Sequence, residues 1–223
     1  MRHVLQVLFA TAAFAVVHSA LAATSVKDAV AVRFRNGRHL YRAAYNAHAV
    51  AAFGLLVWYI ARRPKRTIYR FRGVSAGLMR LGQLGGIGFA VAAARATGLA
   101  TLSGLDNVMA IVSGTPARPV PAAQGPEAHE SGALRIRGPF ELVRHPLNLA
   151  PLAPFWLTPH MTSRRLAFNL AATAYLAVGS IHEEKRLLRQ YGEAYAAYQR
   201  GGVPFYLPRR SSARIAVGEG PAS

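Results

Sequence analysis

Long apolar runs separated by arginine-rich stretches constrain this chain more than any other feature of its sequence. Apolar residues make up 52% of the 223 residues, and a helix of about 20 apolar residues crosses a ~30 Å hydrocarbon core. Backbone polar groups cannot be left unpaired in lipid, so such runs must be helical. The sequence therefore predicts an all-α fold, a polytopic integral membrane helical bundle with five or six membrane segments.

Three runs have the length and composition of membrane spans, at residues 4–23, 40–60 and 74–94. The first run ends in "ALA", which would also pass as a secretory cleavage site, but we favour a retained helix because further spans follow. Residues 98–114 are apolar too, yet they contain Asp106 and Asn107. This segment is therefore expected to be either an interfacial helix or a sixth span.

The next part of the chain is a predicted linker followed by a helical hairpin. Residues 115–133 are rich in Pro, Ala and Gly and have no hydrophobic period, so we expect a linker with no core and no chemistry. Residues 146–181 hold two apolar runs divided at 158–162. Because Pro151 and Pro154 interrupt the first run, a short, broken helix should form a tight hairpin with the longer second one.

The C-terminal part of the chain has a different pattern. Residues 182–200 alternate charged and apolar positions with a helical period, which predicts an amphipathic interfacial helix lying on the membrane. Residues 209–223 have the composition of a disordered tail. We accordingly expect a single integral membrane domain over residues 1–208.

The charge balance limits the partners. The formal net charge is +18, since 27 Lys and Arg face nine Asp and Glu. The basic residues flank apolar segments, which favours contact with membrane lipids and argues against nucleic acid. The absence of cysteine excludes disulfides, thiolate metal sites and cysteine nucleophiles. No metal site is predicted, and the oligomeric state is left open.

The number of spans decides where the basic segment 62–72 lies. Five spans would place it on the membrane face opposite the hairpin ends, whereas six would place it on the same face.

The two ends of the hairpin carry the residues with most chemical potential. Arg144 and His145 precede its first helix, and His182, Glu183 and Glu184 follow its second. A proline at the next position, Pro146, suits the start of a helix, whose free N–H groups favour an anion. The cluster predicts either a site for a ligand with an anionic part and a cationic or hydroxyl-bearing part, or an ion-pair cluster that only holds the hairpin together.

A histidine in the first span gives a second candidate. His18 and Ser19 lie among apolar residues near its end, where a histidine usually makes an interhelical hydrogen bond. If functional, His18 would accept a proton or orient an acceptor. His48 in the second span leaves open a further alternative, in which the two histidines are axial ligands of a haem.

The C-terminal motifs resemble a known family. "GPFELVRHPLN", a hairpin, "EE" and "YGEAYAAYQRGGVPFYLP" follow one another over about 75 residues, 134–208. This order is similar to the membrane isoprenylcysteine carboxyl methyltransferase and phospholipid methyltransferase group, whose pattern runs Gly-Pro-Tyr, Arg-His-Pro-x-Tyr, hairpin, Glu-Glu, Phe-Gly-x-x-Tyr-x-x-Tyr and Val-Pro. "HSALAATSVKDAV", "YRAAYN" and "LSGLDNV" resemble the branch that contains nurim and the methanethiol S-methyltransferases.

The resemblance implies a function and a site. It implies methyl transfer from S-adenosylmethionine to a small or lipophilic acceptor, such as a thiol, an isoprenylcysteine carboxylate or a lipid. We expect the enzyme to lie in the bacterial inner membrane with its active face cytoplasmic. A nurim-like, non-catalytic scaffold or assembly protein is the alternative. The candidate catalytic residues are Arg144 and His18, and the implied cofactor-binding residues are Gly138, Arg144, His145, Pro146, Glu183 and Glu184.

Two positions depart from the family pattern. Asn148 stands where the family has the tyrosine after Arg-His-Pro, and Phe140 stands at the first aromatic position. We therefore expect a contact to adenine or substrate to be altered in this chain.

Overall fold

The long helices of the protein are the predicted spans. The computed structural model describes residues 1–34, 37–117, 124–128 and 133–206. Three helices are long and apolar enough to cross a membrane, α1 (Arg2–Ala22), α3 (Gly37–Ala61) and α4 (Gly73–Thr97). Only 11%, 6% and 11% of their most apolar windows are buried inside the protein. Their side chains therefore face outward, as lipid-exposed helices require.

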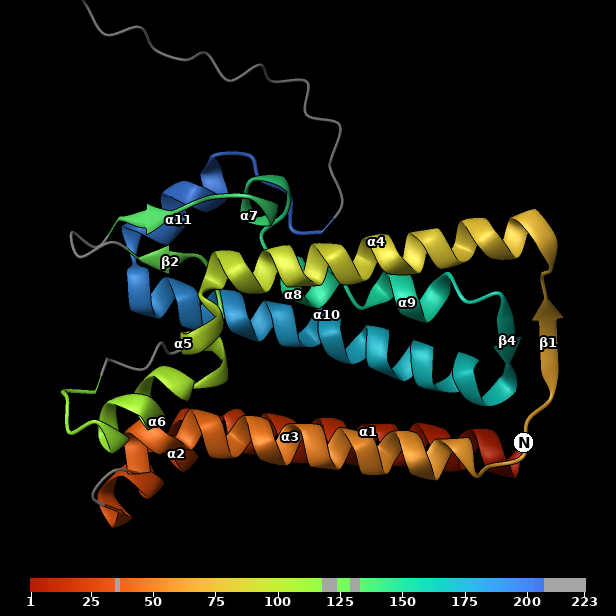
Figure 1. Ribbon diagram of the computed structural model, residues 1–223, viewed down its shortest axis with the longest axis horizontal. Helices are drawn as coiled ribbons and strands as arrows, with labels where there is room; N and C mark the ends of the chain where they lie inside the picture. The colour runs from red at the N-terminus through yellow and green to blue at the C-terminus, as the bar shows by residue number, and fades with distance from the viewer. Residues whose placement is uncertain (35–36, 118–123, 129–132, 207–223) are drawn as a thin grey trace, which may run out of the picture.

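The helices run side by side along the long axis of the molecule (Figure 1). α1 and α3 form one layer, and α10 (Ser163–Tyr191) packs between them and α4. Two short helices, α8 (Pro146–Leu149) and α9 (Leu152–Trp156), fill the space between α4 and α10. The main core cluster joins α1, α3 and α10 and consists of Val7, Leu56, Ile60 and Ala167.

The predicted hairpin is present, with α8 and α9 as its broken arm and α10 as its long arm. Prolines remove helical hydrogen bonds there, and neighbouring side chains bind the carbonyls that are released. Asn169 Nδ2 donates to the Phe155 carbonyl at 2.6 Å, and Gln83 Nε2 donates to the Pro154 carbonyl at 3.1 Å. The irregular backbone of the broken arm is thus stabilised by polar side chains of α10 and α4.

Short strands are an element that the all-α prediction missed. β1 (Thr67–Arg70) pairs antiparallel with β4 (His160–Thr162) and joins the end of α3 to the start of α10. β2 (Glu127–Ala128), inside the predicted linker, pairs with β3 (Leu134–Arg135), which follows the linker. Pro126 in that linker is fully buried, so the described part of the linker packs against the rest of the protein.

The chain between α4 and the linker does not form a long helix. It folds as α5 (Leu99–Ser103) and α6 (Leu105–Val112), separated by Gly104 at φ +82°. A Cβ at Gly104 would lie 2.7 Å from the backbone nitrogen of Ala43, so this close approach to α3 requires glycine. Helices of five and eight residues cannot cross a ~30 Å core. The short helix α2 (Thr24–Arg33) was also not predicted.

The predicted amphipathic helix over 182–200 was wrong as one element. α10 continues through this segment to Tyr191, and Gly192, at φ +51°, ends it. The chain then forms α11 (Glu193–Arg200), whose Tyr195 and Tyr198 are buried against protein. The predicted tail, 209–223, lies outside the described residues.

The close contact of α4 with α9 generates a stability prediction. A Cβ at Gly86 would lie 2.5 Å from the Ala153 Cβ and 3.1 Å from the Ala150 carbonyl oxygen, whereas a Cβ at Gly85 meets nothing within 4 Å. We expect Gly86→Ala to lower the free energy of unfolding by about 1–3 kcal/mol through overpacking. Gly85→Ala, the matched control, gains helix propensity and should be neutral or stabilising by up to about 1 kcal/mol. Unfolding in detergent measures both, and equal effects would contradict the packing.

Candidate functional site

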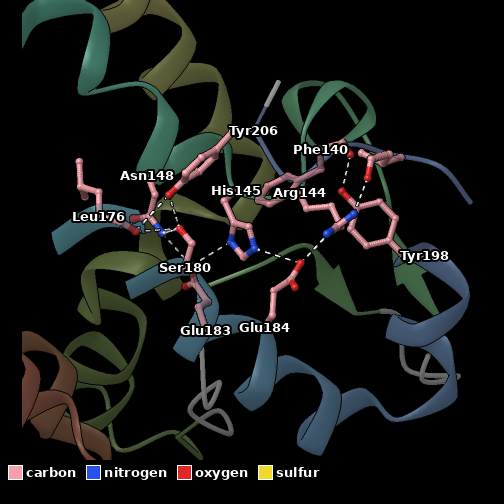
Figure 2. Close-up of polar contacts among 11 residues, drawn as sticks. Phe140, Arg144, His145, Asn148, Leu176, Ser180, Glu183, Glu184, Tyr198 and Tyr206 are labelled. Carbon is pink, nitrogen blue, oxygen red and sulfur yellow. Dashed lines mark hydrogen bonds and ion pairs between the residues drawn. The ribbon is translucent and has the colours of Figure 1, made fainter. Parts of the chain in front are cut away.

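The two ends of the hairpin meet, as predicted, in a cluster of charged side chains (Figure 2). Arg144, just before α8, donates through Nε to Glu184 Oε1 of α10 at 2.7 Å. The guanidinium also donates through one terminal nitrogen to the Val203 carbonyl at 2.6 Å, and the Arg144 backbone N–H donates to the Pro204 carbonyl at 2.9 Å. The side chains of Arg144 and Glu184 are only 16% and 17% exposed, so water solvates them little. Each buried charge is therefore stabilised by the other, and the position of Arg144 is also stabilised by these carbonyls.

The neighbouring carboxylate, Glu183, has separate partners. Its Oε2 accepts from Asn148 Nδ2 at 3.0 Å and lies 3.3 Å from His145 Nδ1. Its Oε1 accepts from the backbone N–H of Gln124 at 3.0 Å. The two glutamates therefore share His145 but otherwise have different partners, as expected for adjacent helical positions. Gln124 lies in the predicted linker, so the linker contacts the cluster through a backbone N–H.

His145 stands between the two carboxylates (Figure 2). Its side chain is 1% exposed, and its Nε2 lies 3.3 Å from Glu184 Oε1. This contact is an ion-pair contact, and the buried Nε2 makes no geometrically well-formed hydrogen bond among the described residues. The ring also packs against Phe205, with centroids 4.7 Å apart. His145 therefore contacts one glutamate through each ring nitrogen.

Asn148, the departure from the family pattern, belongs to the same network. Its Nδ2 donates a hydrogen bond to Ser180 Oγ at 2.8 Å as well as the one to Glu183. Ser180 Oγ in turn lies 2.5 Å from the Tyr206 hydroxyl. The amide thus links Glu183 to a serine and a phenol. Sequence reasoning missed Ser180, although its position one helical turn before Glu184 on α10 was a usable signal. Nothing in the sequence indicated that Tyr206 would reach this site.

Electrostatics favour the ionised form of Glu184, which lies beyond the apolar part of α10. Burial opposes its ionisation, but the hydrogen bond from Arg144 and the charges of Arg144 and His145 outweigh it, so the pKa of Glu184 lies below its ordinary value. On α11, burial raises the pKa of Tyr195 and Tyr198, and both phenols stay neutral. Tyr198 donates to the Phe140 carbonyl at 2.5 Å, whereas the Tyr195 hydroxyl is buried with no partner among the described residues.

Three predicted residues lie outside this network. Gly138, at φ +58°, forms the turn before α7 (Pro139–Leu142), and no recorded contact among the described residues joins it to the cluster. Pro146 occupies the first position of α8 and is fully buried. α8 is a single turn of four residues, however, so the expected anion site at its N-terminus is not supported. His182 is exposed and does not join the cluster.

His18, on α1, lies away from the charged cluster and contacts side chains of α3 and α10. Its Nε2 is 2.6 Å from the Tyr45 hydroxyl, and its ring faces Tyr175 of α10 with centroids 6.1 Å apart. Tyr175 and Glu184 are nine residues apart and so occupy opposite faces of α10. The structure therefore does not bring His18 into the charged cluster. His18 and His48 line one apolar groove between α1 and α3, but axial ligation of a haem through Nε2 would break the bond to Tyr45.

The Arg144–Glu184 pair generates a second prediction. Arg144→Gln leaves Glu184 buried without its main cation and should lower the free energy of unfolding by about 2–4 kcal/mol. The double variant Arg144→Gln/Glu184→Gln should be more stable than Arg144→Gln, because no charge is left alone. As a control, Arg200→Gln breaks the exposed pair with Glu193, 64% and 79% exposed, and should change stability by less than about 1 kcal/mol. Simple additivity of the two cluster substitutions would contradict the pairing.

Comparison with known proteins supports the resemblance inferred from the motifs. The chain is 46% identical to methanethiol S-methyltransferase 2 of Bradyrhizobium diazoefficiens over 70 residues, which is 31% of this chain and 27% of that protein. It is 40% identical to the Pseudomonas deceptionensis methanethiol S-methyltransferase over 77 residues (34% and 29%), and 41% identical to the Mycobacterium tuberculosis one over 69 residues (31% and 28%).

These matches cover less than a third of the relatives' own length. No protein-family profile matches the chain, and no solved structure matches it. The named relatives carry the assignment: in sequence, this chain resembles the methanethiol S-methyltransferase-like branch of the isoprenylcysteine carboxyl methyltransferase-like family.

Proposed function

We propose that this protein is an S-adenosylmethionine-dependent membrane methyltransferase that methylates a small thiol. The observation that carries the proposal is the meeting of Arg144 and His145 with Glu183 and Glu184 at the hairpin ends. Similarity to proteins named methanethiol S-methyltransferase supports the reaction class and the thiol acceptor. The similarity to named methyltransferases also counts against the alternative of a non-catalytic scaffold protein. No feature of the site specifically favours that alternative.

The residues of the cluster fit the polar groups of S-adenosylmethionine. Arg144 would hold its carboxylate, and Glu183 and Glu184 would hold its ammonium group or ribose hydroxyls. Two buried atoms without hydrogen bonds, Nε2 of His145 and the hydroxyl of Tyr195, are available for further polar contacts. Bound cofactor supplies a methyl group already activated on a sulfonium, so the protein's task is positioning and exclusion of water.

Several features prepare the cluster for this task. The carbonyls of Val203 and Pro204 orient Arg144, which reduces the rotamer freedom lost on binding. Because the pKa of Glu184 is lowered, its carboxylate is negative at neutral pH and suits an ammonium group. The segment around Gly125 covers α10 closely, since a Cβ there would lie 2.7 Å from Leu187. Ligand binding would replace part of the Arg144–Glu184 contact with contacts to the cofactor.

His18 is our candidate for handling the thiol proton. If Nε2–H donates to the Tyr45 oxygen, and the Tyr45 hydroxyl donates to the His18 carbonyl 3.4 Å away, Nδ1 keeps its lone pair. Nδ1 is buried with no partner among the described residues. It would accept the thiol proton while the thiol sulfur takes the methyl group, the S–CH₃ bond of the sulfonium breaks and a neutral thioether leaves. An apolar groove beside His18 suits a small apolar thiol.

We further infer five membrane crossings, made by α1, α3, α4, the α8–α9 arm and α10. This count places the charged cluster at one membrane face and the basic segment 62–72 at the other (Figure 1). The cofactor is a charged solute supplied by the cytoplasm, so the cluster would face the cytoplasm from a bacterial inner membrane.

Cofactor binding is the primary test. Calorimetry on the purified protein should show saturable binding of S-adenosylmethionine, and Arg144→Ala and Glu184→Gln should each weaken it by about 1.5–3 kcal/mol, the scale of a charged hydrogen bond. Arg189→Gln is a control, because Arg189 lies on the same helix but is exposed. No saturable binding by the wild-type protein would refute the proposed function. Unchanged affinity in both cluster variants, with lowered thermal stability, would show a purely structural ion-pair cluster.

The acceptor and His18 are tested by methyl transfer. Among thiols, prenylcysteines and phospholipids, small thiols should take up the methyl group. His18→Gln should lower kcat by roughly 10²–10⁴-fold, the range of general base catalysis, with cofactor affinity unchanged. Ser19→Ala removes a neighbouring bond to Tyr175, 3.2 Å long, and serves as a packing control. Wild-type kcat in His18→Gln would remove His18 from the mechanism.

A further inference from the structure

The end of the bundle opposite the charged cluster carries a second strongly charged surface. There the loop after α3, the strands β1 and β4 and the starts of α4 and α10 come together (Figure 1). Eight basic residues lie in these segments, and residues 58–72 and 157–167 contain no Asp or Glu. The eight are Arg62, Arg63, Lys65, Arg66, Arg70, Arg72, Arg164 and Arg165. We call this surface the basic end.

The acidic residues are gathered at the other end of the molecule. The described ones belong to α2, α6, β2, α7, the last turns of α10, and α11, and these elements lie together away from β1 and β4 (Figure 1). Every ion pair recorded among the described residues involves one of those acidic side chains. The basic end therefore has no counter-charge within the described part of the chain.

Some cations of the basic end serve the fold. Arg164 donates through one terminal nitrogen to the carbonyls of Ala61 and Arg63 and so binds free carbonyls at the end of α3. Arg165 donates to the Thr158 hydroxyl at 3.0 Å and to the His160 carbonyl at 2.8 Å. These two side chains connect the α3 end to the hairpin turn, and their substitution would disturb the fold.

Other cations point to no protein partner. The side chains of Lys65, Arg66 and Arg70 are exposed, and no hydrogen bond or ion pair to them is recorded among the described residues. Lys65, Arg70 and Arg165 lie near His160, whose pKa is below its ordinary value because of partial burial and of their positive charges. The histidine therefore stays neutral, and the three cations repel one another unless an anion lies between them.

Exposed apolar side chains alternate with these cations. Trp58, Ile68 and Phe71 are 50%, 50% and 47% exposed, and Arg62 lies over the Trp58 ring at 4.3 Å. The surface adjoins the end of α3 and the start of α4, both candidate spans. Cations mixed with exposed aromatic and aliphatic side chains at the end of a span match the boundary between phosphate headgroups and acyl chains.

We propose that the basic end binds the phosphate headgroups of anionic phospholipids through Lys65, Arg66 and Arg70, with Ile68 and Phe71 against the acyl chains. The N-termini of the long helices α4 and α10 lie at the same end and add positive potential toward the phosphates. Bound lipid supplies the counter-charge that the protein lacks there. This site is independent of the proposed methyl transfer.

Binding of defined lipids to the full-length protein in detergent tests the proposal. Phosphatidylglycerol should bind at least about tenfold more tightly than phosphatidylcholine, and added salt should weaken this preference. Lys65→Gln/Arg66→Gln/Arg70→Gln should bind phosphatidylglycerol roughly a hundredfold more weakly, given about 1 kcal/mol per cation near an anionic surface. The control Arg33→Gln/Lys185→Gln/Arg189→Gln removes the same charge from exposed positions at the other end and should retain wild-type affinity.

Three outcomes would overturn the proposal. They are equal affinity of the wild-type protein for the two lipids, equal loss in the triple variant and its control, and full competition by inorganic phosphate at matched concentration, which would indicate a free-anion site. If the triple variant does not fold, Lys65→Gln alone replaces it, because the Lys65 side chain is exposed and no hydrogen bond or ion pair to it is recorded among the described residues. That single variant should bind phosphatidylglycerol about fivefold more weakly.

Discussion

The contact between Arg144 and Glu184 closes the hairpin on which the rest of the site depends. A cation and a carboxylate at 16% and 17% exposure are stable only as a pair or with other partners. Their attraction fixes the start of α8 against the last turns of α10 and thereby brings His145 between two carboxylates. The C-terminal segment joins through the Val203 and Pro204 carbonyls, so one ion pair organises three parts of the chain.

A paired cluster can be both a structural lock and a ligand site. In the protein alone, Arg144, Glu183 and Asn148 each have partners, so the cluster holds the hairpin together without a ligand. A zwitterionic ligand presents the same charges as the pair that it separates, since its carboxylate can replace Glu184 on Arg144 and its ammonium can replace Arg144 on Glu184. The structural role and the ligand-binding role therefore use the same arrangement of side chains, and they differ in whether a ligand occupies it.

Hydrophobic patterning was enough to predict the long helices and the hairpin, because lipid leaves a long apolar run few alternatives to a helix. The meeting of Arg144 with Glu184 followed from the hairpin alone. Patterning could not predict β1 and β4, since strands of four and three residues have no period of their own and pair far apart in the sequence, with Arg70 opposite His160. It also failed for Gln124 and Tyr206, which reach the site through backbone geometry and a chain reversal that no local signal encodes.

Asn148 shows how a departure from a family pattern acquires a physical meaning. Its amide donates to Glu183 and Ser180, and the phenol that contacts Ser180 belongs to Tyr206, 58 positions further along the chain. A tyrosine at position 148 could not donate from a single hydroxyl to both acceptors at these distances. The amide thus ties Glu183 into the internal network, and Glu184 is the more exposed of the two carboxylates, 17% against 11%.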